Sequence, residues 1–160
     1  MALTKVTYAM IEGAVVNVLD YIPPAEHASI QAGTSTYDCT AGVQAAVDAL
    51  KSNPVTISGT TCYLGGTVYF PKGLYNITHS TLDVSNVLDL TFVGDGSRGY
   101  HSYYIAPTRI VVDGTGSIST SYGIKLLANK SRNFSMRNMS LEYSNSFAGS
   151  LIYTTAPGLT

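Results

Sequence analysis

The sequence is poor in charge, contains little cysteine and lacks tryptophan. Only 12% of its 160 residues are charged, and the formal net charge is −1. This balance provides no basic field that would attract nucleic acid or an anionic membrane. Two cysteines, Cys39 and Cys62, are too few for a disulfide scaffold or a zinc site, so we expect two free thiols.

Long hydrophobic runs and a secretion signal are also missing. No apolar run approaches the ~20 residues that a membrane-spanning helix needs, so we expect no membrane insertion. The opening MALTKVTYAMIEGAVV lacks the apolar segment and cleavage site of a secretory signal, so export by the general pathway is not expected. What the chain does contain is 45% hydrophobic residues and 12 tyrosines, enough for the core of one domain.

One segment has the spacing of an amphipathic helix. Its apolar residues follow the i, i+3, i+4, i+7 pattern, at Val43, Ala46, Val47 and Leu50. We expect a helix over Thr40–Leu50, capped by Asp38 or Thr40 and ended by Asn53-Pro54. Its small apolar side chains predict that it packs onto another structure.

After Pro54 the sequence changes to short β-rich runs separated by Gly, Asn, Asp, Ser and Pro. These runs occupy residues 65–70, 74–77, 88–94, 108–114, 123–127, 134–143 and 151–155. In the run 134–143 the alternation shifts at Asn138, which predicts a corner or bulge. The runs begin roughly 17 to 25 residues apart, as coils of a solenoid do, and no second helical pattern separates them. We therefore expect an all-β parallel β-helix, with an antiparallel sandwich as the alternative.

The stretch LTFVGDGSRGY (90–100) contains the G-x-G-x-x-G spacing of a dinucleotide-binding turn. Such a turn must open a helix, but the following residues are rich in Tyr, include Pro107 and enter another strand. We therefore reject nucleotide binding and expect no cofactor. Gly94 and Gly96 are expected to turn the chain sharply with positive φ.

Five segments come in a familiar order and spacing. They are NVLDY (17–21), TAGVQAAVDAL (40–50), GGTVYFPKGLYNI (65–77), LDLTFVGDGSR (88–98) and FSMRNMSLEY (134–143). Together they resemble the beginning of the pectate-lyase-like right-handed parallel β-helix of bacteriophage tailspike and tail-fibre proteins. Many of these proteins have a G-A-x-G-D-G-x-x-D-D loop before the helix, whereas this chain has a longer loop (22–39) without the acidic pair. That difference weakens any catalytic or metal-binding role for the loop.

The resemblance implies a division of the chain and a role for it. Residues 1–21 would form a lead and tail-attachment segment, residues 22–54 a loop and capping helix, and residues 55–160 the first coils. The chain would be a structural virion component of the phage tail, assembled in the host cytoplasm as a homotrimer. Its partners would be other tail proteins and bacterial surface polysaccharide. Since no closing cap follows the last run, we expect either that the natural protein continues past Thr160, which we favour, or that other chains cover this edge.

The candidates for catalysis are dispersed along the sequence. Glycoside hydrolysis needs two carboxylates ~5–10 Å apart, and the candidates are Asp83, Asp89, Asp95, Asp113 and Glu142. Aspartates at coil corners more often bind the turn backbone. Arg98 and Arg109 could meet a uronate, although solvated corners are the simpler interpretation. His27, His79 and His101 have no nucleophile-elbow context. We therefore assign no catalytic or metal-binding residue.

Two segments are candidate contact surfaces. Tyr100, Tyr103 and Tyr104 could stack on sugar rings or pack between the subunits of a trimer. The lead segment could contact the tail through its apolar residues Met10, Ile11, Val15 and Val18.

Three functions remain open at this point. One is the structural tail role, and another is a polysaccharide depolymerase, a glycoside hydrolase or lyase acting on capsule or lipopolysaccharide. A secreted pectate-lyase-like enzyme is the third, and the lack of a secretory signal counts against it.

Overall fold

The computed structural model describes residues 15–57, 59–79, 82–96, 107–113, 122–127, 133–144 and 150–155. The helices are the 3-10 helix η2 (Val18–Tyr21), α1 (Pro24–Ala32) and α2 (Thr40–Leu50). The strands are β1 (Val15–Asn17), β2 (Ser52–Ile57), β3 (Thr60–Leu64), β4 (Thr67–Phe70), β5 (Gly73–Thr78), β6 (Leu82–Asp83), β7 (Val87–Leu88), β8 (Thr91–Gly94), β9 (Thr108–Asp113), β10 (Tyr122–Leu127), β11 (Ser135–Arg137), β12 (Ser140–Tyr143) and β13 (Ser150–Thr155).

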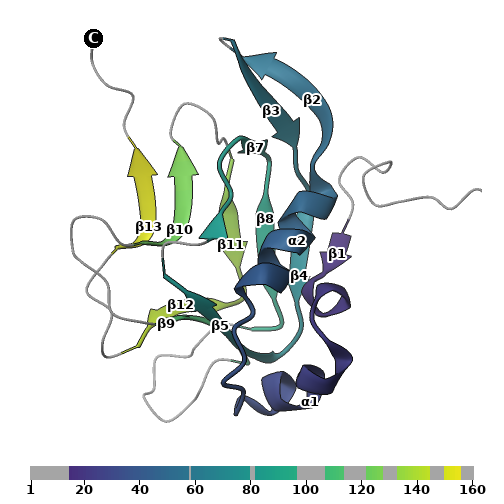
Figure 1. Ribbon diagram of the computed structural model, residues 1–160, viewed down its shortest axis with the longest axis vertical. Helices are drawn as coiled ribbons and strands as arrows, with labels where there is room; N and C mark the ends of the chain where they lie inside the picture. The colour runs from purple at the N-terminus through teal and green to yellow at the C-terminus, as the bar shows by residue number, and fades with distance from the viewer. Residues whose placement is uncertain are drawn as a thin grey trace, which may run out of the picture.

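The strands form four small sheets that are almost entirely parallel (Figure 1). Apart from β2 and β3, consecutive strands enter different sheets, and later strands return beside earlier ones in the orders β1-β4-β8-β11, β5-β9-β12 and β6-β10-β13. The fourth sheet joins β2, β3 and β7, and its β2–β3 hairpin is antiparallel. The expectation of a mostly parallel β protein is confirmed. The antiparallel sandwich is wrong for the described strands, since only one pair among them runs antiparallel.

The core consists of apolar side chains stacked in register from strand to strand. Val16 pairs with Val68, Val68 with Phe92, and Phe92 with Met136. The Phe92 ring lies 5.1 Å from that of Phe70 and 5.3 Å from that of Phe134, between ring centroids. Such ring pairs add to the free energy gained by burying the rings themselves.

Helix α2 covers the first strands, and it spans the predicted residues (Figure 1). Its apolar face is at most 2% exposed at Val43, Ala46, Val47 and Leu50. Gly42 lets the helix approach closely, because a Cβ there would lie 2.9 Å from the Tyr21 carbonyl oxygen. The helix ends before Asn53-Pro54, which lie inside β2. The described residues contain no helix long and apolar enough to cross a membrane.

Helix α1 occupies part of the segment 22–39 that we expected to be a loop. Pro24 starts it, and Gly33 ends it with a left-handed φ of 73°. Only Ile30 is fully buried, while Ala25, Ala28 and Ala32 are exposed. With one apolar anchor the segment has no amphipathic period, so its sequence pattern resembles that of a loop.

The predicted role of Gly94 and Gly96 is wrong, because neither has a positive φ. A Cβ on Gly94 would lie 2.5 Å from the Asn138 carbonyl oxygen and 2.8 Å from the Met139 Cβ. Glycine is therefore needed there for close packing between strands. The left-handed corners are instead at Asn86, Asp89, Asn133 and Asn138. Asn138 separates β11 from β12, which confirms the predicted corner.

Candidate functional site

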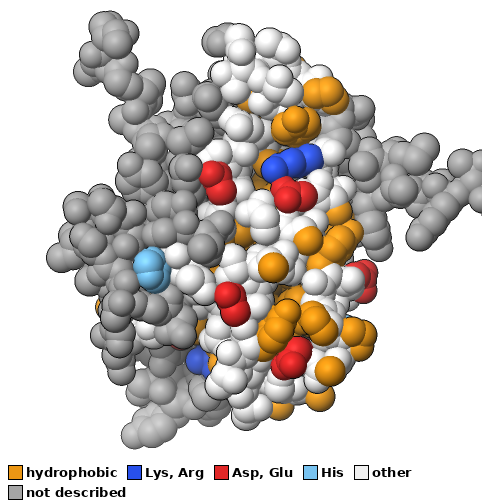
Figure 2. All heavy atoms as spheres, viewed as in Figure 1, with side chains coloured by type: hydrophobic (Ala, Val, Ile, Leu, Met, Phe, Trp, Pro, Cys, Tyr) orange, Lys and Arg blue, Asp and Glu red, His pale blue; other side chains and the backbone are white. Residues whose placement is uncertain are grey.

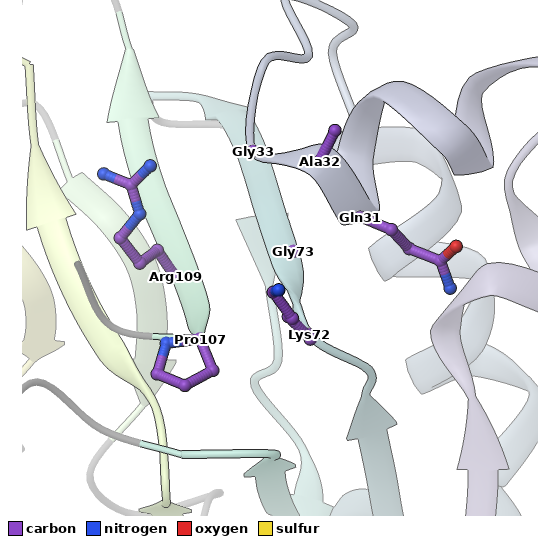
Figure 3. Close-up of a pocket in the computed structure, with 7 residues that line it drawn as sticks. All are labelled: Gln31, Ala32, Gly33, Lys72, Gly73, Pro107 and Arg109. Carbon is purple, nitrogen blue, oxygen red and sulfur yellow. The ribbon is translucent and has the colours of Figure 1, made fainter. Parts of the chain in front are cut away.

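A cleft opens between the end of α1 and the starts of β5 and β9 (Figure 3). Its volume is about 340 Å³, and seven residues line it: Gln31, Ala32, Gly33, Lys72, Gly73, Pro107 and Arg109. We call it the basic cleft, because Lys72 and Arg109 are its charged side chains. It joins segments that are far apart in the sequence.

Two glycines shape the basic cleft. Gly33 ends α1, and its amide donates a hydrogen bond to the Ile30 carbonyl oxygen at 2.9 Å. A Cβ on Gly73 would lie 2.8 Å from the Ile30 Cγ2 atom, so glycine lets β5 approach the helix. The Gly73 amide in turn donates to the Pro107 carbonyl oxygen at 2.7 Å, which joins the β5 side of the cleft to the β9 side.

The charges of the basic cleft are only partly compensated. The Arg109 side chain is 20% exposed, and its Nη1 atom lies 3.8 Å from the Glu142 Oε2 atom. The other Glu142 carboxylate oxygen accepts a hydrogen bond from the Ser140 hydroxyl at 2.7 Å. Among the described residues, no carboxylate lies within ion-pairing distance of the Lys72 ammonium. The cleft can therefore attract an anion.

Asp95 lies beside the basic cleft and is occupied by two donors. Its Oδ1 atom accepts from the Tyr69 hydroxyl at 2.6 Å, and its Oδ2 atom accepts from the Lys72 amide at 2.7 Å. The hydrogen bond to this carboxylate raises the pKa of Tyr69. Asp95 thus holds the turn between β4 and β5, as expected of an aspartate at a corner.

The other candidate carboxylates also bind neighbouring groups. Asp83 accepts from the Ser85 amide at 2.8 Å, and Asp89 accepts from the Asn133 side-chain amide at 2.6 Å. Asp89 has a left-handed φ of 55°, so it is a corner residue and not part of a strand as we expected. Asp113 ends β9. No cluster of three or more His, Cys, Asp or Glu in the described part of the chain could hold a metal ion.

Only some of the remaining residues that the sequence analysis singled out lie in the part of the chain that the structure describes. Tyr100, Tyr103, Tyr104, Met10, Ile11, Arg98 and His101 lie outside the described residues. Val15 is 57% exposed on β1, whereas Val18 is fully buried in the core. The Nε2 atom of His27 lies 2.9 Å from the Ile22 carbonyl oxygen.

Both cysteines are buried and neither forms a disulfide, as predicted. Burial raises the pKa of the Cys39 thiol to about 12. A thiol of this kind is protonated at neutral pH and is therefore a poor nucleophile.

The sequence alone did not reveal the basic cleft. Arg109 was considered as a partner for a carboxylate, but Lys72 and Gln31 were not. The available signal was the Lys72-Gly73 pair between the predicted strand runs 65–70 and 74–77. It becomes informative only once α1 is known to pack against Gly73.

Comparison with known proteins gives one result at the level of structure. No family model matches the chain, and no curated protein matches it. The chain is similar to ORF18 of Geobacillus virus E2, with a TM-score of 0.43 and 19% sequence identity. That similarity covers 81% of this chain and 24% of the viral protein, so the chain spans about a quarter of the protein that it matches.

Proposed function

We propose that this chain is the N-terminal part of a bacteriophage tailspike or tail fibre, which attaches to the tail and begins a right-handed parallel β-helix. The observation that carries the proposal is the repeated return of the strands. The series β4, β5, β6 is followed by β8, β9, β10 and then by β11, β12, β13, each in the same three parallel sheets. One such return corresponds to one coil of a solenoid.

The covered first coil supports a role at the beginning of the β-helix. A solenoid that starts with an exposed strand edge presents unpaired backbone groups, so natural solenoids cover that end. Here α2 packs on η2, β1 and β4. The order lead segment, helix and coils also agrees with the five segments that resemble phage tail proteins.

The full protein would then present its coils to the bacterial surface as a homotrimer and recognise polysaccharide there. The alternative function is a depolymerase of capsule or lipopolysaccharide. Its hydrolytic form requires two carboxylates about 5–10 Å apart across a groove, and no carboxylate is among the described residues that line the basic cleft. We therefore expect this segment to have no hydrolytic activity.

Light scattering tests the trimer. We expect a mass three times the 17.0 kDa of one chain, and a stable monomer would contradict the proposal. Incubation with capsule or O-antigen is expected to leave chain lengths unchanged, and shortened chains would favour the depolymerase.

A deletion tests the attachment to the tail. Phage particles assembled with a protein that lacks residues 3–20 should carry few copies of it, while the undeleted protein decorates them fully. Full decoration by the deleted protein would refute attachment through this segment.

A further inference from the structure

We propose that the basic cleft binds the carboxylate of an acidic sugar unit in a host surface polysaccharide. The inference rests on the proposed function, because that function brings the coils into contact with bacterial polysaccharide. It goes further by naming a site, the chemical class of the ligand and the residues that select it.

Positive charge is scarce in this chain, and the basic cleft concentrates it. There are nine Lys and Arg residues in total. Four of them have side chains that the structure describes, and two of those four line the cleft. The face that carries α1 and α2 shows scattered acidic side chains and little Lys or Arg (Figure 2). Lys51 on that part of the molecule is neutralised by Asp48 at 2.6 Å.

The two cations of the basic cleft retain free hydrogen-bonding capacity. Arginine has five N–H donors in a planar fork that matches a carboxylate. Glu142 lies 3.8 Å from Arg109, which is too far for a direct hydrogen bond. Asp95, which accepts from the Tyr69 hydroxyl and the Lys72 amide, keeps its negative charge beside the cleft. No described carboxylate, however, lies within ion-pairing distance of the Lys72 ammonium.

The lining favours an acidic sugar over a neutral one. No aromatic side chain is among the described residues that line the cleft, so stacking on a sugar ring would contribute little. Gln31 also lines the cleft, at the end of α1, but its side chain points away from Arg109 (Figure 3). Charge-assisted hydrogen bonds to the carboxylate would therefore supply most of the selectivity.

A matched pair of oligosaccharides tests the inference by calorimetry on the full chain. The acidic probe is a tetramer of β-1,4-linked glucuronate, and the neutral probe is cellotetraose, which has a hydroxymethyl group in place of each carboxylate. We expect the acidic probe to bind at least about tenfold more tightly than the neutral one. Equal binding of the two, or no binding of the acidic probe, would overturn the proposal.

Variants locate the binding. Lys72→Gln and Arg109→Gln should each weaken binding of the acidic probe about tenfold, and Arg109→Lys should weaken it less. Lys51→Gln is the matched control and should bind like the unaltered protein. If Arg109→Gln does not fold, Lys72→Gln still decides the matter, because Lys72 is exposed. Equal affinities of the Lys72→Gln and Lys51→Gln variants would refute the site.

Inorganic phosphate distinguishes a sugar site from a site for any small anion. We expect it to compete with the acidic tetramer at least about tenfold less well than a glucuronate trimer does. If phosphate displaced the tetramer at the same concentration as the glucuronate trimer does, the sugar assignment would be overturned. None of these failures would affect the trimer mass or the decoration of phage tails, so they are distinguishable from failure of the proposed function.

Discussion

Strands that come early in the parallel sheets bury their apolar side chains more completely than the strands that come last. Val68 and Phe92 are 0% exposed, yet Met136, next in the same register, is only partly buried. The neighbouring sheet repeats the contrast, since Ile110 is fully buried and its partner Leu141 is not.

The difference follows from what packs on either side. Helix α2 covers the first strands, so the side chains between them have neighbours in both directions. Within the described part of the chain, no helix packs on β11 or β12 in the same way. Each strand in these parallel sheets is therefore stabilised chiefly by the elements that pack on either side of it, and its position decides how much each apolar side chain contributes.

Two phenylalanines provide the sharpest test of that contrast. Phe92 is fully buried between Phe70 and Phe134, so Phe92→Ala should lower the free energy of unfolding by about 3–5 kcal/mol. Phe134→Ala removes the same ring from a half-buried position and should cost less than half as much. Urea denaturation followed by circular dichroism measures both. Equal losses would show that position in the stack does not govern stability.

A substitution at Gly94 tests how closely β8 packs against the corner between β11 and β12. Gly94→Ala should cost about 1–3 kcal/mol, because the added methyl group would meet the Asn138 carbonyl oxygen and the Met139 Cβ. Gly96→Ala is the matched control and should cost less, since its nearest contact is the Pro107 Cγ at 3.1 Å. The same urea titration compares them. A smaller loss for Gly94→Ala than for Gly96→Ala would show that this junction is loosely packed.

Much of the local structure could be predicted from the sequence. The spacing of Val43, Ala46, Val47 and Leu50 fixes α2, because one apolar stripe at helical period has few other solutions. The strand runs and the corner at Asn138 follow from alternation and turn residues in the same way. These features depend on residues close together in the chain.

Features that depend on distant residues could not be predicted. Helix α1 is held by the single side chain of Ile30, and Ile30 packs against Gly73 more than 40 residues later. Glycine is needed at position 94 because of Asn138 and Met139, which lie more than 40 residues later, between β11 and β12. The basic cleft forms where the end of α1 packs against Gly73, so the sequence did not reveal it although Arg109 had been considered.

The smallest expected effect concerns the hydrogen bonds that link the start of α2 to β5. Asp38 accepts hydrogen bonds from the Thr40 amide at 2.9 Å and from the Thr78 hydroxyl at 2.9 Å, and thereby links the start of α2 to β5. The N-cap residue of α2 is Cys39, without a side-chain cap hydrogen bond, and not Asp38 or Thr40 as expected. Asp38→Ala should lower the free energy of unfolding by about 1 kcal/mol at pH 7, because it removes partly exposed hydrogen bonds to a carboxylate. Asp48→Ala is the matched control, because Asp48 is an exposed aspartate near the other end of α2 whose loss should cost almost nothing.

Acid provides an independent check on the same carboxylate. Burial acts to raise the pKa of Asp38, but hydrogen bonds from Thr40 and Thr78 outweigh burial and hold that pKa below its usual value. A carboxyl group whose pKa is lower in the folded state stabilises the protein above its unfolded pKa of ~3.9, and this stabilisation is lost as the pH falls through the folded pKa. The stability gap between the unaltered protein and Asp38→Ala should therefore narrow as the pH is lowered from 5 to 3 in parallel urea titrations. A gap that is constant over this range would mean that the Asp38 charge does not hold α2 against β5.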